Sequence, residues 1–297
     1  MRFRRELAAV TLLLVTTYAF PWGRQGHRLV ALVAGDHLTA VAAENVAALL
    51  GRETMADVAS FGDDYRTDHP ETAPWHFVDI PGNEKGYVKE RDCPLPVVGG
   101  RPDVASKWRD CAVDRIAYFI ELLKDPAVDN KQKTFALKML IHLIGDLHQP
   151  LHAMGDARGG NQIRVMAFGS QQCGSYACNL HGVWDVDMIE HHRLDEKKYL
   201  AMLEADIAKN DLTKKPVGTP IAWANASHRA AVEAWVPNGG VIGKEYYESE
   251  IATVDRELEF GGLHLADVLN NVFTAPPAGS ESGPRSVPGS EPVLKPR

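Results

Sequence analysis

The chain has 297 residues, 45% of them hydrophobic and 24% charged, and its formal net charge at pH 7 is −7. The hydrophobic share is typical of a globular protein and excludes a disordered or fibrous chain. The acidic balance argues against a broad basic surface of the kind that usually holds the phosphate backbone of nucleic acids.

The first 21 residues have the pattern of a secretory signal peptide. A basic start of five residues precedes an apolar stretch, Leu7 to Phe20, that is too short to span a bilayer. A retained membrane anchor is the alternative. Cleavage before Trp22 would leave Pro21 at the last signal position, where a small residue is typical, whereas cleavage after Ala19 would leave two residues to be trimmed. We expect a secreted or periplasmic protein.

Helical patterns dominate the rest of the chain, and Pro220 suits the first turn of one of them. The predicted helices cover residues 24–37, 41–50, 104–124, 131–148, 195–209, 220–235, 244–258 and 263–272. Only residues 161–168 favour a strand. The sequence therefore predicts a mainly α fold with one domain over residues 22–274. Residues 275–297 are rich in Pro, Gly and Ser and are predicted to form a disordered tail.

A His-x-x-x-Asp pair occurs twice, as His142 with Asp146 and as His181 with Asp185. Residues four apart lie on one face of a helix, so each pair can grip one cation. The surroundings of the first pair are apolar, which predicts a buried helix. A buried imidazole and carboxylate are costly unless they are paired or coordinated, so they either satisfy each other or hold a metal.

Further imidazoles and a carboxylate make the metal hypothesis stronger. The additional candidate ligands are His27, Asp63, His76 and His152. Mixed nitrogen and oxygen ligands suit zinc, and eight side chains are too many for one tetrahedral ion. Several ions that share a bridging carboxylate would account for the set.

The chain resembles a known family, the trinuclear-zinc, single-strand-specific nucleases. The resemblance runs from Trp22 to about Asn270. It rests on the strings at residues 22–27 (WGRQGH), 59–66 (ASFGDDYR), 75–79 (WHFVD), 142–152 (HLIGDLHQPLH), 159–161 (GGN) and 181–185 (HGVWD). It implies a helical domain of the type shared with zinc-dependent phospholipase C.

The resemblance also implies three zinc ions and assigns their ligands. The first ion would be held by Asp63, His76, His142 and Asp146, and the second by His152, His181 and Asp185. The third would use Asp146 as a bridge, His27, and the free amino group and carbonyl of Trp22 as the mature N-terminus. These ions would form a local phosphate trap on an acidic protein, because bound cations are often the largest charges in a site.

The activity that the resemblance implies is endonucleolytic hydrolysis of single-stranded DNA and RNA to 5′-phosphate products, with a possible 3′-nucleotidase activity. Two closely spaced ions can activate water and clamp both oxygens of an in-line displacement. Arg66 is the candidate for stabilising charge on the phosphate, and a surface salt bridge is its alternative role. Nucleotides are the expected small ligands, and no stable protein partner or membrane insertion after signal removal is implied.

The candidate base-binding residues are Phe77, Asp79 and Asn161. Phe77 can stack on a base, Asp79 can accept hydrogen bonds from the base edge, and Asn161 can add another hydrogen bond. Stacking requires the base to leave its duplex, which predicts slow reaction of intact duplex. Ordinary core packing is the alternative role of Phe77.

The four cysteines form an even set, which favours two disulfides in an oxidising compartment. Three pairings are possible, and we favour Cys93 with Cys111 and Cys173 with Cys178. A zinc half-site is the alternative, although the cysteines lack the usual two-residue spacing.

Two other functions remain open from the sequence: a zinc-dependent phospholipase C and a non-catalytic exported zinc-binding protein. His148 falls on the wrong face of the helix to join His142. Surface or capping roles are expected for the remaining histidines, His37, His69, His191, His192, His228 and His264.

Overall fold

The computed structural model describes residues 22–215 and 217–275. The predicted signal peptide and, from residue 276, the predicted tail lie outside the described residues. The helices longer than one or two turns are α1 (Arg24–Asp36), α2 (Ala40–Leu50), α3 (Phe61–Asp68), α5 (Ala112–Lys124), α6 (Asn130–Leu147), α9 (Glu196–Lys209), α10 (Pro220–Glu233) and α11 (Lys244–Val272). Shorter helical turns connect them: η1 (Pro70–His76), α4 (Lys89–Asp92), η2 (Pro150–Ala153), η3 (Asp156–Arg158), α7 (Leu180–Gly182), η4 (Val183–Asp187), α8 (Met188–His191) and η5 (Leu212–Lys214).

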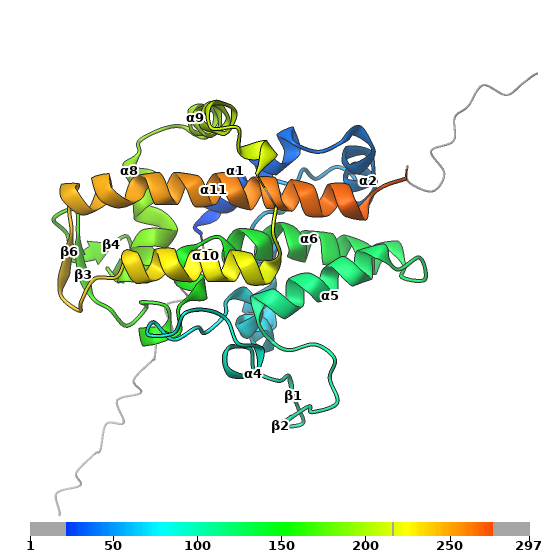
Figure 1. The fold of residues 1–297 in the computed structure, drawn as a ribbon, viewed down its shortest axis with the longest axis horizontal. Coiled ribbons are helices and arrows are strands. Elements are labelled where there is room, and N and C mark those ends of the chain that lie inside the picture. The colour runs from blue at the N-terminus through cyan, green and yellow to red at the C-terminus, as the bar shows by residue number, and fades with distance from the viewer. Residues whose placement is uncertain (1–21, 216, 276–297) are drawn as a thin grey trace, which may run out of the picture.

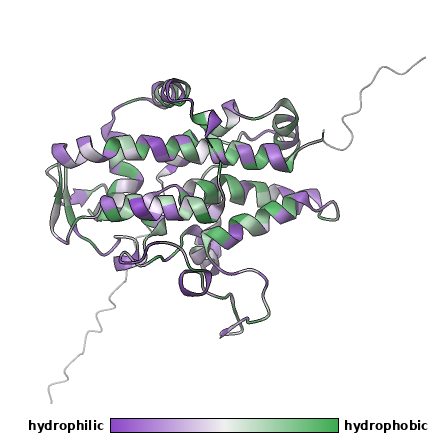
Figure 2. Cartoon of the chain, viewed as in Figure 1, coloured by the Kyte–Doolittle hydropathy of each residue, from purple (hydrophilic) through white to green (hydrophobic). Residues whose placement is uncertain are grey.

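Helix α6 lies at the centre of the molecule. Its residues from Met139 to Leu147 are all buried, and α1, α5, α10 and α11 pack around it (Figure 1). The surrounding helices are amphipathic and show polar residues on their outer faces (Figure 2). The predicted buried helix around His142 and Asp146 is therefore confirmed.

Strands are few and short, so the predicted mainly α fold is confirmed. The expected strand at residues 161–168 is reduced to β3 (Val165–Ala167), which pairs in parallel with β6 (Gly240–Ile242). Two small hairpins were not predicted. They are β1 (Val97–Val98) with β2 (Arg101–Pro102), and β4 (Gln172–Cys173) with β5 (Tyr176–Ala177).

Two predicted helix boundaries were wrong. The helix expected from residue 104 begins at Ala112, because the preceding residues form a loop. The two helices expected at 244–258 and 263–272 are one helix, α11, which runs through Gly261 and Gly262. A Cβ at Gly262 would lie 2.4 Å from Cγ1 of Val33 on α1, so glycine at this position permits close helix packing.

The structure contains both disulfides that the sequence favoured. Cys93 and Cys111 are joined with their Cα atoms 5.1 Å apart, and Cys173 and Cys178 with theirs 4.9 Å apart. Each separation lies in the ordinary range for a disulfide. Among the described residues, no helix has both the length and the apolar character needed to cross a bilayer.

Candidate metal centre

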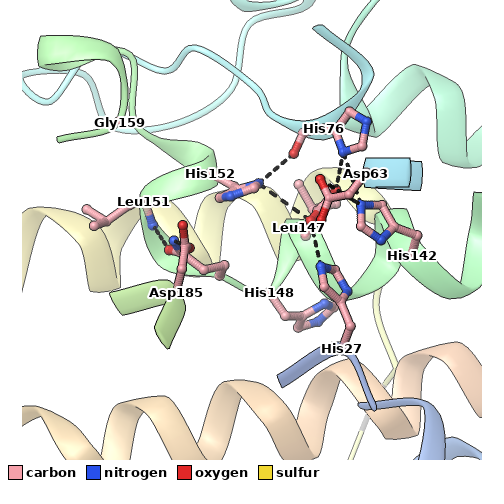
Figure 3. A network of polar contacts seen from close by, with 12 residues as sticks. His27, Asp63, His76, His142, Leu147, His148, Leu151, His152, Gly159 and Asp185 are labelled. Carbon is pink, nitrogen blue, oxygen red and sulfur yellow. Dashed lines mark hydrogen bonds and ion pairs between the residues drawn. The ribbon is translucent and has the colours of Figure 1, made fainter. Parts of the chain in front are cut away.

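Side chains from six segments of the chain meet in the interior beside α6. His142 and Asp146 lie one turn apart on α6, and the other candidates come from α1, α3, η1, η2 and the turn formed by α7 and η4. Figure 3 shows the rings of His27, His76, His142 and His152 directed toward a common region. The candidate ligands are therefore brought together, although His27 and Asp185 are far apart in sequence.

Asp146 occupies the middle of this cluster. Its Oδ2 lies 2.9 Å from Nδ1 of His76 and 3.2 Å from Nε2 of His142, and its Oδ1 lies 3.3 Å from Nε2 of His27. Two groups could each hold a cation here: His76 with His142 and Asp146, and His27 with Asp63 and His142. A carboxylate with neighbours on both oxygens has the position that a bridging ligand needs.

A third group, separate from the first two, consists of His152, His181 and Asp185. The rings of His152 and His181 are stacked with their centroids 4.9 Å apart. Nε2 of His181 lies 3.4 Å from Oδ2 of Asp185, as the spacing of four residues predicted. The three side chains are buried.

Backbone carbonyls orient three of these imidazoles. Nδ1 of His142 is 2.9 Å from the carbonyl oxygen of Ala59, Nδ1 of His152 is 2.7 Å from that of His76, and Nδ1 of His181 is 2.7 Å from that of Gly159. A proton on each Nδ1 leaves the lone pair on Nε2, as in most metal-binding histidines. Nε2 of His152 has no hydrogen-bond partner among the described residues, so this donor set fits a metal ion.

The protonation of the outer imidazoles suits the same role. Burial lowers the pKa of His76 and of His152 to about 3 and that of His181 to about 4. All three are therefore neutral at pH 7, which is the form that coordinates a metal.

The acidic side chains carry an electrostatic cost. Burial raises the pKa of Asp63 to about 7 and that of Asp185 well above its usual value. Burial also opposes charge on His142, but Asp146 and Asp63 outweigh it and raise the pKa of His142 to about 9. A bound cation would remove the penalty of ionising the buried carboxyls, and this is a second reason why the residues fit a metal.

Trp22 is fully buried at the entrance to α1, beside this cluster. The backbone N–H of the next residue, Gly23, donates a hydrogen bond of 2.6 Å to the carbonyl oxygen of Asp185. The main chain at Trp22 is thus attached to the segment that carries the third group. Ligation by a free amino group of Trp22 stays a prediction, because it requires cleavage directly before this residue.

Sequence reasoning missed two residues that shape the centre. The side-chain amide of Gln149, fully buried, donates to Oδ1 of Asp185 and accepts from the N–H of Leu151. Gly62 leaves room for the ring of His142, since a Cβ there would lie 2.2 Å from Cδ2 of that ring. Gln149 stands inside the string HLIGDLHQPLH, and a buried amide among candidate ligands is the signal that could have identified it.

Phe77 and Asp79 share the outward face of an extended segment that follows His76. Phe77 is partly exposed and lies outside the described hydrophobic core, which does not support the core-packing alternative. Asp79 is exposed. Their common direction follows from the two-residue period of extended chain.

Arg66 and Asn161 lie beside these features. Nη2 of Arg66 is 3.2 Å from Oδ1 of Asp63, and the Arg66 side chain is only 13% exposed, so its ion pair is not a surface salt bridge. Asn161 follows four residues with positive φ, 157–160, and its side-chain amide donates to the carbonyl oxygen of Arg158.

The surface or capping role expected for the remaining histidines was wrong for two of them. His148 points away from the groups, as predicted, and its Nε2 lies 2.7 Å from Nδ1 of His264. His264 and His228 are buried rather than at the surface, and His228 lies between the carbonyl oxygens of Ala153 and Glu84. A histidine that stands alone in the sequence can thus pair with backbone groups that no pattern reveals.

A family model described as S1/P1 nuclease matches residues 22–274. Nuclease P1 of Penicillium citrinum is 28% identical over 282 residues, which cover 84% of this chain and 97% of that protein. Endonuclease 2 of Arabidopsis thaliana is 28% identical over 298 residues, covering 89% and 97%. Nuclease S1 of Aspergillus oryzae is 26% identical over 301 residues, covering 91% and 98%. The matched range includes every residue of the three groups.

Proposed function

The chain belongs to the S1/P1 nuclease family and is a phosphodiesterase, and we propose that it depends on zinc, binds three zinc ions and cleaves single-stranded DNA and RNA to 5′-phosphate products. The observation that carries this proposal is the convergence of His142, His152 and His181, each oriented by a backbone carbonyl, with the buried carboxyl groups. When bound, the zinc ions supply Lewis acidity and an activated water.

We assign nine metal ligands. The first ion is held by Asp63, His76, His142 and Asp146, the second by His152, His181 and Asp185, and the third by Asp146, His27 and the terminal amine and carbonyl of Trp22. The overlap of the two groups around His142 supports adjacent ions, and the contacts of Asp146 with His76 and with His27 support its role as the shared ligand.

The protein's other residues bind and orient the substrate. Arg66 reaches the phosphate from beside Asp63, where its guanidinium stabilises charge that develops on the phosphate oxygens. Phe77 stacks on the base, Asp79 accepts hydrogen bonds from the base edge, and Asn161 adds a polar contact from the neighbouring loop. A base held in this way has left its duplex, which explains the preference for single strands.

The signal peptide pattern and the disulfides both support export of the protein. A signal peptide over residues 1–21 would release Trp22 as the amino terminus, and two disulfides are typical of oxidising compartments. We therefore propose a secreted or periplasmic enzyme. Activity on 3′-nucleotides would use the same centre.

The test uses purified mature protein with single-stranded DNA, matched duplex and phosphatidylcholine vesicles. Each substrate is assayed as purified, after chelation, and after zinc is restored. We expect rapid release of 5′-mononucleotides from the single strand, its loss on chelation and its recovery with zinc. Lipid cleavage would instead indicate a phospholipase, and no turnover at three bound zinc ions would leave only metal binding.

A further inference from the structure

Residues 77–80 follow η1 as a largely extended segment that tightens at its end, where the N–H of Ile80 donates to the carbonyl oxygen of Val78 at 3.1 Å, and the side chains from His76 to Ile80 alternate in direction. His76, Val78 and Ile80 are buried, whereas Phe77 is partly exposed and Asp79 is exposed. Phe77 has φ −148° and ψ 174°, which is extended backbone. The backbone N–H and C=O groups of such a segment point alternately to its two edges, so each edge can be attached to a different part of the protein.

One edge is attached to the residues around the metal centre. The N–H of Val78 donates to the carbonyl oxygen of His152 at 2.8 Å, and Nδ1 of His152 lies 2.7 Å from the carbonyl oxygen of His76. Further along, the N–H of Gly155 donates to the carbonyl oxygen of Ile80 at 2.8 Å. The candidate ligands themselves therefore fix this edge.

The opposite edge is attached to two segments that carry no candidate ligand. The carbonyl oxygen of Phe77 accepts a hydrogen bond of 3.0 Å from the N–H of Ala112, and the N–H of Asp79 donates to the carbonyl oxygen of Asp92 at 3.3 Å. In addition, the indole N–H of Trp75 donates to the carboxylate of Asp110 at 2.9 Å. Two of these contacts are made by the backbone of the proposed base-binding residues themselves, and the third is made by Trp75, two residues before Phe77.

The Cys93–Cys111 disulfide joins the two segments at the points of contact. Cys93 follows Asp92 directly, and Cys111 stands between Asp110 and Ala112. Two hydrogen bonds accompany the disulfide: the guanidinium of Arg109 donates to the carbonyl oxygen of Cys93, and the N–H of Asp110 donates to that of Pro94, both at 2.8 Å.

The chain between the two cysteines offers little other support. It protrudes from the helical body as the β1–β2 hairpin and its flanking loops (Figure 1). Its apolar side chains are not buried: Val97 is 65% exposed, Val98 67% and Val104 84%. Without the covalent bond, the segments around Asp92 and Ala112 would be joined through this exposed loop, a few hydrogen bonds and one ion pair, in which Nζ of Lys89 lies 2.8 Å from Oδ2 of Asp114.

We propose that the Cys93–Cys111 disulfide is a positioning element for substrate recognition, which clamps the outer edge of residues 76–80 and so fixes the base-binding face formed by Phe77 and Asp79. This inference rests on the proposed function, because it assigns those two residues to the base. The candidate metal ligands His76 and His152 are joined to each other at the other edge, so we expect them to keep their places when the clamp is lost. Loss of the disulfide therefore weakens binding of the nucleobase while metal and phosphate binding persist.

The test compares two double variants in zinc-loaded protein. Cys93→Ser/Cys111→Ser removes the clamp, and Cys173→Ser/Cys178→Ser removes a disulfide that has no hydrogen bond to residues 75–79 among those described. The dissociation constants of thymidine 5′-monophosphate and of inorganic phosphate are measured by calorimetry, together with bound zinc. For the first variant we expect nucleotide affinity to fall about fivefold or more, as loss of base stacking would cause, with phosphate affinity and zinc content unchanged. The second variant should match the wild type.

Kinetics on a single-stranded oligonucleotide supply an independent readout. Removal of the clamp should raise KM while kcat stays within about twofold, because an interaction made equally with substrate and transition state affects binding alone. Equal losses of nucleotide and phosphate affinity, or equal changes in both variants, would show that the disulfide only supports the fold. Absence of turnover by the wild type would refute the proposed function, whereas the affinity comparison would still decide the role of the clamp.

A single substitution keeps the test decisive if the double variant fails to fold. Ala112→Pro retains the disulfide but removes the N–H that donates to Phe77. Ala112 is the first residue of α5, where proline is tolerated, and Cys111 has φ −155° and ψ 163°, which suits the residue before a proline. The same selective loss of nucleotide affinity is expected, and unchanged affinity would overturn the proposal.

Discussion

The carboxyl group of Asp79 lies in surroundings that disfavour its charge. Although the residue is exposed, desolvation by nearby protein raises the pKa of Asp79 to about 6, with a further contribution from Asp92 that Arg158 partly opposes. An ionised carboxylate only accepts hydrogen bonds, whereas a protonated one offers a donor to a base edge that also presents N–H groups. Asp79 should therefore be effective only above this pKa.

The pH dependence of substrate binding tests this assignment. We expect KM for a single-stranded dinucleotide to rise as pH falls through about 6, approaching tenfold per pH unit if the ionised form alone binds. The diester phosphate of this substrate does not titrate in that range. In Asp79→Asn the side chain cannot ionise. The KM values of this variant and of the wild type should therefore approach each other as the pH falls. If the KM values of the wild type and of Asp79→Asn change in parallel from about pH 4.5 to 8, the ionised form of Asp79 does not contact the base.

At the scale of elements, the site depends on how closely α1 can approach α11 and α6. Gly262 on α11 faces Val30 and Val33 of α1, and a Cβ there would also lie 3.1 Å from the carbonyl oxygen of Val30. His27, one turn before Val30, is carried by the same helix into the metal centre. The glycine that weakens α11 as an isolated helix thus permits the packing that places a candidate ligand.

Gly262→Ala should lower stability by about 1–3 kcal/mol, because overpacking outweighs the gain of about 0.5–1 kcal/mol in helix propensity. Gly35→Ala is the matched control. Gly35 lies in α1, and a Cβ added there would have no neighbouring atom within 4 Å, so this substitution should raise stability by about 0.5–1 kcal/mol. Urea unfolding of both variants measures whether each substitution raises or lowers the free energy of unfolding. A stabilising Gly262→Ala would mean that the two helices can separate without cost.

At the scale of the whole molecule, the candidate ligands link segments from α1 to η4, so metal binding and folding are coupled. The buried acidic side chains Asp63 and Asp185, whose pKa values burial raises, lie within this region. Without cations, the penalty of burying them remains with the folded state. Any ion that binds the folded chain alone adds stability according to its concentration relative to its dissociation constant.

Removal of the metals should therefore lower the midpoint of thermal unfolding. At a thousandfold excess over the dissociation constant one site contributes about 4 kcal/mol, which corresponds to a decrease of about 10 °C for a domain of this size. Calorimetry before chelation, after chelation and after addition of zinc measures the change. Asp146→Ala, which removes the shared carboxylate, should show a smaller shift on chelation. An unchanged midpoint in the wild type would contradict the coupling of metal binding to folding.

The sequence by itself determined the mainly α class and most helix spans, and it favoured the disulfide pairing and the set of side chains that the structure brings together in the interior. Helical periodicity and the spacing of His142 with Asp146, or of His181 with Asp185, are local properties that a single segment carries. The wider grouping depended on the resemblance of several separate strings to one family. Short elements such as α3 and η1 were missed because they are too short to show a period.

Only the tertiary structure decided which atoms of those residues face one another. His76 meets Asp146 across 70 positions of the chain, and His142 is oriented by the carbonyl oxygen of Ala59. Every residue has a carbonyl group, so no sequence pattern marks the one that will hold an imidazole. Backbone partners and close packing are properties of the assembled fold. For this reason the sequence did not predict the hydrogen bonds at the two edges of residues 76–80, the burial of His228 or the continuity of α11.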